Sequence, residues 1–220
     1  RLVATESEVG VVSSIVGIRR VEIVGVGMAN HAGTTDMRRR VDALVPVAHV
    51  VARCPALVDG LDDAVITCGR LQVDPGAPNI VPGRAAAIVE IRARDNATLD
   101  TIEGRLRSLV SGVTPAVSGG RCAEIGLEPV VVVAPTPTND TLNTLLSEIL
   151  ESRGVPFLYL ASMAGHDTQR VARRGRASMF FIPSIDGVSH NPDEDSREAD
   201  IELAGDLMLA WAECCVRECL

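Results

Sequence analysis

The feature that most constrains this 220-residue chain is an apolar run at 178–182 that ends at a proline and leads through Asp186-Gly187 to His190. An apolar run of this kind, followed by Asp-Gly, predicts a buried strand that feeds a turn. His190 should then lie in the loop beyond the carboxyl end of a strand, where open α/β sheets place their ligands. A second histidine, His166, lies shortly upstream in Ala-Gly-His-Asp at 164–167. The region therefore predicts a functional site built on an α/β sheet.

Strands and helices alternate through the last hundred residues. The sequence predicts strands at 130–133, 157–160 and 178–182, and helices at 139–153, 166–174 and 196–218. The four consecutive valines at 130–133 are typical of a strand buried on both faces. This alternation is typical of a sheet that helices cover on both faces, and it predicts a partial α/β domain.

The preceding residues follow another order. Alternation at 11–28 predicts one or two strands, with Gly17 between them. A helix near 41–51, strands at 63–73 and 84–93, and a helix at 98–110 follow. The order β-α-β-β-α predicts a ferredoxin-like α+β layer. We therefore expect an inserted domain at 19–117 between the two pieces, 1–18 and 118–220, of the partial α/β domain.

A polar loop at 30–37 leads into the first of these helices. Thr34 or Thr35 could cap it, and Asp36 would suit its dipole. Pro46 falls inside the helical pattern and is expected to kink the helix, because it removes a backbone hydrogen bond.

Composition excludes several classes of protein. A net charge of −8 disfavours a general nucleic-acid binder, and no apolar run approaches the length of a membrane span. All basic residues are arginine, and the clusters Arg38–Arg40 and Arg173–Arg174 are interpreted as solvated helix faces. The six cysteines form no C-x-x-C pair and are expected to be buried free thiols, which, with no signal peptide at the start, favours the cytoplasm.

Several motifs resemble one family. Ala-Gly-His-Asp at 164–167 and Ile-Pro-Ser-x-x-Gly-Val-Ser-His-x-Pro-x-Glu at 182–194 resemble the carboxyl-terminal half of the metal-dependent carbamoylases. These are N-carbamoyl-L-amino-acid hydrolase, beta-ureidopropionase and allantoate amidohydrolase, relatives of the aminoacylase-type metallopeptidases. His-Ala-Gly-Thr-Thr-x-Met at 31–37, with Arg40 and 42–44, resembles the signature of their lid domain, although the family usually has proline where this chain has Asp36. The resemblance covers nearly the whole chain.

The resemblance implies a role for each candidate residue. His31 would cross a dimer interface and polarise the scissile carbonyl in the other subunit, as an oxyanion-hole donor. Asn79 and Arg92 would hold the substrate carboxylate, and His166 would contact the substrate near the metals. The alternatives for His31, Asn79 and Arg92 are a loop histidine that caps its own helix, a turn asparagine and an arginine on a sheet surface.

The resemblance also implies a metal site. His190 would ligate one of a pair of divalent metals, zinc or manganese, whose bound water is the nucleophile. One histidine cannot hold two metals, and the acidic residues at 193–195 suit a helix start better than a metal site. His49, among apolar neighbours, is expected to be structural.

The remaining ligands and the general-base glutamate belong, in the family, to the amino-terminal half. Residues 1–12 resemble the segment that follows a His-x-Glu-Gln-Gly ligand motif, and none of the upstream motifs occurs in this sequence. We expect a hydrolase of carbamoyl, ureido or acyl C–N bonds in a small amino-acid-like carboxylate. It would be completed by an amino-terminal-half polypeptide and would form a homodimer through the lid. The alternatives are a non-catalytic binding or assembly subunit and a fragment of a longer enzyme.

Overall fold

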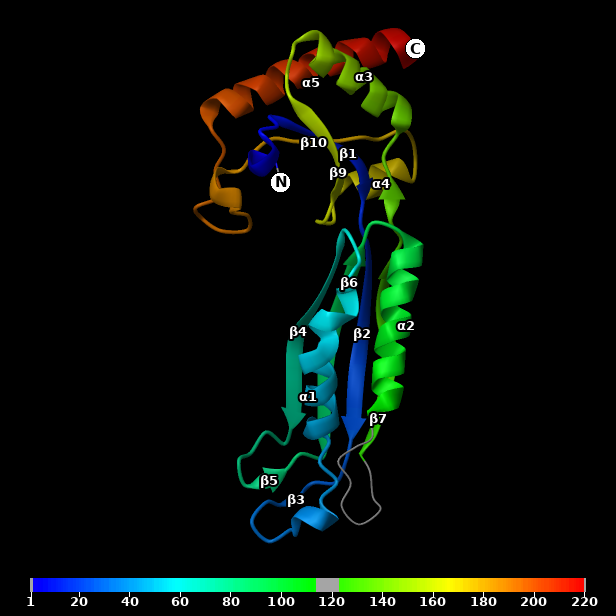
Figure 1. The fold of residues 1–220 in the computed structure, drawn as a ribbon, viewed down its shortest axis with the longest axis vertical. Coiled ribbons are helices and arrows are strands. Elements are labelled where there is room, and N and C mark those ends of the chain that lie inside the picture. Colours follow the sequence, from blue (N-terminus) through cyan, green and yellow to red (C-terminus); the bar gives the residue numbers. More distant parts are fainter. Residues whose placement is uncertain (1, 114–122, 220) are drawn as a thin grey trace. The chain divides into compact units, whose positions relative to one another are not determined.

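The structure, a computed structural model, describes residues 2–113 and 123–219 and divides into two compact units (Figure 1). Unit 1 comprises residues 1–16 and 136–220, and unit 2 comprises Gly17–Pro135. Unit 2 is therefore inserted in unit 1. The predicted boundary after residue 117 lies outside the described residues, and the division follows Pro135 instead.

Unit 2 is a four-stranded antiparallel sheet with two helices. Its strands are β2 (Gly17–Val26), β4 (Ala64–Asp74), β6 (Arg84–Ala93) and β7 (Glu124–Val133), in the order β4-β6-β2-β7. The helices are α1 (Leu44–Arg53) and α2 (Asn96–Gly112). The chain order is β-α-β-β-α-β, whose first five elements are those predicted from the sequence.

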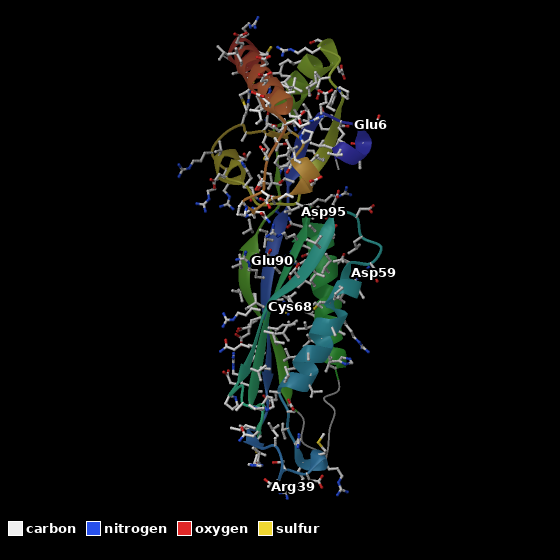
Figure 2. All side chains as sticks on the ribbon, turned by 90° about the vertical axis from the view of Figure 1, so that its left-hand side faces the viewer. Glu6, Arg39, Asp59, Cys68, Glu90 and Asp95 are labelled. Atoms are coloured by element: carbon white, nitrogen blue, oxygen red, sulfur yellow. The ribbon has the colours of Figure 1, made fainter. Side chains whose placement is uncertain are left out.

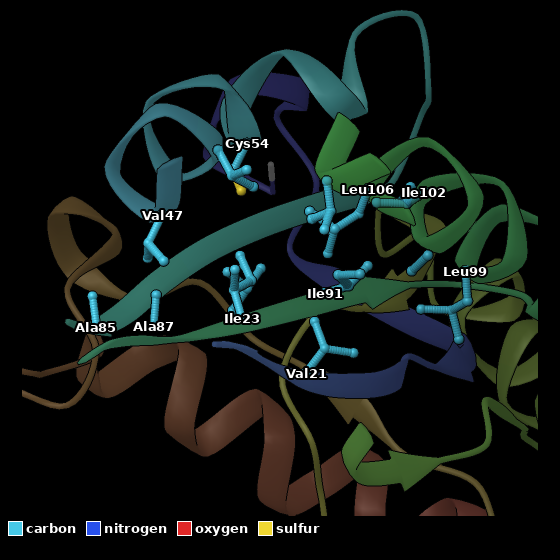
Figure 3. Packing of buried hydrophobic residues seen from close by; sticks show 14 of the residues in the cluster. Val21, Ile23, Val47, Cys54, Ala85, Ala87, Ile91, Leu99, Ile102 and Leu106 are labelled. Carbon is cyan, nitrogen blue, oxygen red and sulfur yellow. The ribbon is translucent and has the colours of Figure 1, made fainter. Parts of the chain in front are cut away.

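One face of this sheet carries the core. Alternate residues of β2 and β6 point to the helices, which is the period of two that a half-buried strand requires. Figure 3 shows these side chains meeting those of α1 and α2. The buried residues it labels are Val21, Ile23, Val47, Cys54, Ala85, Ala87, Ile91, Leu99, Ile102 and Leu106.

The valine run at 130–133 is not the buried interior strand that its composition indicates. It ends β7, which pairs with β2 at the edge of the unit 2 sheet and belongs to no sheet of unit 1. Val130 and Val132 are 53% and 71% exposed. The prediction was wrong because an unbroken apolar run carries no period from which the face or the partner can be inferred.

The expected kink at Pro46 is also wrong, because α1 begins later than the sequence pattern suggests. The helix starts at Leu44, so Pro46 lies in its first turn, where backbone N–H groups have no intrahelical acceptor. Asp36 instead caps the separate 3-10 turn Met37–Arg39 by accepting the backbone N–H of Arg38 at 2.8 Å.

Unit 1 is built around the strand β1 (Val9–Ile15). β9 (Phe157–Ser162) pairs with it in parallel, and β8 (Thr136–Pro137) and β10 (Phe180–Phe181) pair with it antiparallel. The helices α3 (Asp140–Ser152) and α5 (Glu198–Cys219) pack on one face of β1, and the five-residue helix α4 (Thr168–Ala172) precedes β10.

The two faces of β1 are covered differently. Val9 and Val11 pack against residues of α3 and α5, including Leu146, Leu207 and Trp211. On the other face, Val12 and Ile15 form a smaller cluster with strand residues and Met179, and no described helix contributes to it. The prediction of helices on both faces is thus met on one face within the described residues.

Two further expectations concern burial. Of the cysteines whose side chains the structure describes, Cys54 is buried, whereas Cys68, Cys214 and Cys215 are partly exposed, so the expectation of buried thiols holds for Cys54 alone. Within residues 2–113 and 123–219, no helix is long and apolar enough to cross a membrane.

Candidate functional site

His31 is held by its own turn. It lies in β3 (Asn30–His31), and its Nδ1 accepts the backbone N–H groups of Gly33 at 3.0 Å and Thr34 at 3.2 Å. Backbone amides can only donate, so Nδ1 presents its lone pair and the neutral ring carries its proton on Nε2. The side chain is exposed. The turn therefore presents an N–H donor to solvent. The ring accepts the amides of its own turn and does not cap a helix, as the predicted alternative had it, because Asp36 caps the next helical turn.

Asn79 lies beside this turn. β5 (Ile80–Val81) pairs antiparallel with β3, with His31 opposite Ile80, and the Asn79 carbonyl accepts the backbone N–H of Ala32 at 2.9 Å. The Asn79 side chain is exposed. The structure thus brings together two of the candidate residues, far apart in the sequence, on one small β-ribbon.

Arg92 lies on the helix-free face of the unit 2 sheet. Its Nε donates to Oε1 of Glu90 at 2.7 Å, and the other oxygen of that carboxylate accepts from Nε of Arg20. Arg20 is opposite Glu90 in the β2–β6 register, so the three side chains form a row across two strands. A guanidinium fixed in this way is pre-oriented for a second carboxylate.

Arg92 and Asn79 do not meet within one chain. Arg92 is eight residues along β6 from Arg84, or about 26 Å at about 3.3 Å per residue. The β3–β5 ribbon lies beyond the end of the sheet where β6 begins (Figure 1). Figure 2 likewise shows Glu90, the partner of Arg92, apart along unit 2 from Arg39, which lies in the segment that follows His31. The expected joint grip of Asn79 and Arg92 on one small carboxylate cannot be made by a single copy.

The Glu90 carboxylate makes stability depend on pH. Partial burial raises its pKa, but the hydrogen bonds and charges of Arg20 and Arg92 outweigh this effect and hold it below the ordinary value of 4.5. A depressed pKa in the folded state adds stability at higher pH that is lost as the carboxylate is protonated. The free energy of unfolding, measured in urea, should therefore fall as the pH drops below about 4.5. Glu90→Gln should flatten this dependence, and Glu124→Gln, at an exposed site on β7, should not. Parallel curves for wild type and Glu90→Gln would contradict the assignment.

His166 follows β9 and is also oriented by a local contact. Its Nδ1 lies 3.1 Å from the backbone nitrogen and 2.8 Å from Oγ1 of Thr168, and the backbone N–H donates to it. The ring therefore also carries its proton on Nε2 when neutral. Because β9 is parallel to β1, His166 lies beyond the carboxyl end of a parallel strand, where such sheets place their ligands.

His190 lies in the loop beyond the carboxyl end of a strand, as the sequence predicts. It follows β10, but β10 is antiparallel to β1, so its loop starts at the opposite end of the sheet from that of β9. His190 has a positive φ of 57°, and its backbone N–H donates to Oε2 of Glu194 at 2.8 Å. The ring is exposed and makes no hydrogen bond among the described residues. The acidic residues at 193–195 do not begin the helix, because α5 starts at Glu198.

A cavity in unit 1 connects the segments that precede the two histidines. It has a volume of about 760 Å³, and Leu160–Ala164 and Phe181–Ser184 contribute to its lining. Among the described residues, no group of three histidine, cysteine or carboxylate side chains could hold a metal ion. His190 is suited to be one ligand of a metal ion, because its imidazole is exposed and makes no hydrogen bond among the described residues. The described residues do not form a complete metal site.

Comparison with known proteins gives the family. The model of peptidase family M20/M25/M40 matches residues 9–213. The chain belongs to the M20/M25/M40 family. An allantoate amidohydrolase of Bacillus subtilis (strain 168) is 31% identical over 201 residues, covering 89% of this chain and 47% of that protein. An N-carbamoyl-L-amino-acid amidohydrolase of Paenarthrobacter aurescens is 32% identical over 203 residues, covering 92% of this chain and 48% of that protein.

A solved structure agrees with this assignment. The crystal structure of an amidase of the hydantoinase/carbamoylase family from Burkholderia vietnamiensis is 33% identical, with a TM-score of 0.83 over 96% of this chain and 50% of that chain. The resemblance inferred from the motifs is therefore confirmed. This M20/M25/M40 chain spans about half the length of the curated relatives it matches.

Sequence reasoning missed the residues that orient the candidates. Glu90 accepts a hydrogen bond from Arg92 and another from Arg20. The backbone N–H of Thr168 donates to the ring of His166. A signal for Glu90 was present, because it lies two residues before Arg92 on a strand and so shares its face. His49 is exposed on α1 and is not the packed residue that its apolar neighbours suggested.

Proposed function

We propose that this chain is the substrate-orienting part of a metal-dependent amidohydrolase that cleaves a carbamoyl, ureido or acyl C–N bond in a small amino-acid-like carboxylate. The observation that carries the proposal is the His31 turn. An exposed imidazole whose Nδ1 accepts two backbone N–H groups offers a pre-oriented Nε2–H donor. Such a donor stabilises the oxyanion that forms when water adds to an amide or ureido carbonyl.

The other candidates take complementary roles in this proposal. Arg92 binds the substrate carboxylate, supported by its fixed guanidinium beside Glu90. His166 lies next to the scissile group and donates from Nε2. His190 contributes one ligand to a metal pair, zinc or manganese, which when bound supplies an activated water as nucleophile. The other ligands and the general base would come from a polypeptide segment corresponding to the other half of the relatives.

The separation of Arg92 from the His31–Asn79 ribbon supports a dimeric site. One small substrate cannot reach both ends of unit 2, so at least one of the two groups acts on a substrate bound by another copy. We propose that His31 and Asn79 reach the neighbouring copy and that the lid-like unit 2 forms the dimer. Mixed dimers of His31→Ala and His190→Ala chains would then contain one intact site, although either variant alone is inactive. Inactive mixed dimers would argue against this arrangement.

The test of the proposed function uses the protein purified from its own source. Native mass spectrometry with metal analysis should find this chain in a complex that contains bound divalent metal, and the complex should release ammonia or an amine from N-carbamoyl amino acids, allantoate or acyl amino acids. Removal of the metal by a chelator should abolish turnover, and zinc or manganese should restore it. A metal-free assembly of this chain alone, inactive on all three classes, would favour a binding or assembly subunit.

Arg92→Ala should raise KM strongly for carboxylate substrates, because a charge-assisted contact present in both the ground state and the transition state is lost. Steady-state kinetics measures this effect, with Arg70→Ala, an exposed arginine on the neighbouring strand β4, as the matched control. With a substrate analogue that has an amide in place of the carboxylate, wild type and Arg92→Ala should have similar KM values. If Arg92→Ala leaves KM unchanged, Arg92 does not bind the substrate carboxylate.

A further inference from the structure

We infer that Arg40 is a positioning residue for His31, because its guanidinium fixes the turn whose amides hold the imidazole. This inference rests on the proposed function only for its kinetic consequence. Its structural content concerns the turn alone and can be tested without any substrate.

Arg40 differs from the neighbouring arginines. Arg38 is 86% exposed and pairs with Asp36, and Arg39 is exposed. Arg40 is half-buried, and it donates from Nε to the carbonyl of Thr35 at 3.2 Å and from Nη2 to the carbonyl of Ala32. The interpretation of 38–40 as a uniformly solvated face is therefore wrong for Arg40.

The contacts of Arg40 complete the hydrogen bonding of the His31 turn. The amides of residues 33 and 34 donate to the imidazole, and the amide and hydroxyl of Thr35 both donate to the His31 carbonyl. The amide of Ala32 donates to the carbonyl of Asn79. The carbonyls of residues 32 and 35 accept from the Arg40 guanidinium. One planar guanidinium thus joins the two ends of the segment that cups the imidazole. Lysine could not do this equally well, because its ammonium is a point donor without a fixed fork.

The imidazole of His31 and its turn are in close contact, so a small movement of the turn changes the position and hydrogen bonding of the ring. A Cβ on Gly33 would lie 3.2 Å from Cε1 and 3.5 Å from Nδ1 of His31. The amide of Gly33 can approach the ring this closely because glycine has no side chain. If the carbonyls were released, the amides of residues 33 and 34 would turn away from Nδ1, and both imidazole tautomers would become populated.

The test is ¹⁵N NMR of the histidine rings in the 220-residue chain, recorded above neutral pH, because the two nitrogens of a neutral imidazole have distinct shifts when one tautomer dominates. His31→Gln assigns the His31 signals. We expect wild type and Arg38→Ala, the matched control, to show His31 protonated on Nε2 alone. Arg40→Ala should bring the two His31 nitrogen shifts together, with His49, His166 and His190 unchanged, and Arg40→Lys should give an intermediate result.

Two outcomes would overturn the inference. One is an Arg40→Ala chain in which His31 keeps the wild-type shifts. The other is a change of all four histidines together in both Arg40→Ala and Arg40→Lys, which would mean that Arg40 supports the fold in general. In the active complex, Arg40→Ala should lower kcat about 10²-fold with KM nearly constant, as expected for a displaced transition-state donor. The NMR experiment needs no substrate, so its result tests the role of Arg40 independently of the proposed activity.

Discussion

Replacement of His31 by Ala is expected to lower kcat about 10²–10³-fold while KM changes little, because a donor aimed at a developing oxyanion acts mainly in the transition state. The local geometry supports this size of effect. The ring is oriented by two backbone N–H groups before any substrate binds, so little reorganisation is needed when charge develops on the carbonyl oxygen.

Two variants make the measurement specific. His49→Ala removes an imidazole from an exposed site in the same unit and should leave both constants unchanged. His31→Gln keeps an N–H donor near the position of Nε2 and should recover part of kcat. Equal activity of His31→Ala and wild type would exclude the oxyanion role. A rise in KM alone would instead make His31 a group that binds substrate and transition state equally.

The alternation of buried and exposed residues made much of unit 2 predictable. Val21 and Ile23 in β2 and the alternate residues of β6 gave the strands, and Leu99, Ile102 and Leu106 gave α2. These predictions succeed because each element buries one face only, so its period is written in the sequence. The valines of β7 have no such period, and the sequence could not tell a buried strand from an exposed edge.

The candidate site was predictable as a set of residue types but not as an arrangement. The motifs predicted that Asn79 and Arg92 bind one substrate carboxylate together. Arg92, however, lies about 26 Å along β6 from the start of that strand, near which Asn79 lies. Spacing along a chain does not fix distance in space when a β-strand intervenes. In the same way, His190 follows a strand as predicted, but the direction of β10 was set by its pairing with β1, which no local pattern reveals.

Replacement of Gly27 by Ala is expected to lower the free energy of unfolding by about 3 kcal/mol, the upper part of the range for overpacking. A Cβ at this position would lie 2.2 Å from the carbonyl oxygen of Val41 and 2.9 Å from the nitrogen of Ala43. Both are backbone atoms, so no side-chain rotation can relieve the contact. The same carbonyl accepts the N–H of Met28 at 2.8 Å, and this bond attaches the end of β2 to the start of α1.

Gly104→Ala is the matched control, because the Cβ it would add has no atom within 4 Å apart from the neighbouring backbone of its own helix, and the residue is exposed inside α2. There the change should raise stability by about 0.5–1 kcal/mol, since alanine loses less conformational freedom than glycine in a helix. Urea unfolding followed by circular dichroism measures both values. Because Gly27 immediately precedes the segment that leads to His31, its variant should also disturb the ring spectrum of that residue. A Gly27→Ala protein as stable as wild type would show that the segment at 41–43 can move away from β2 without cost.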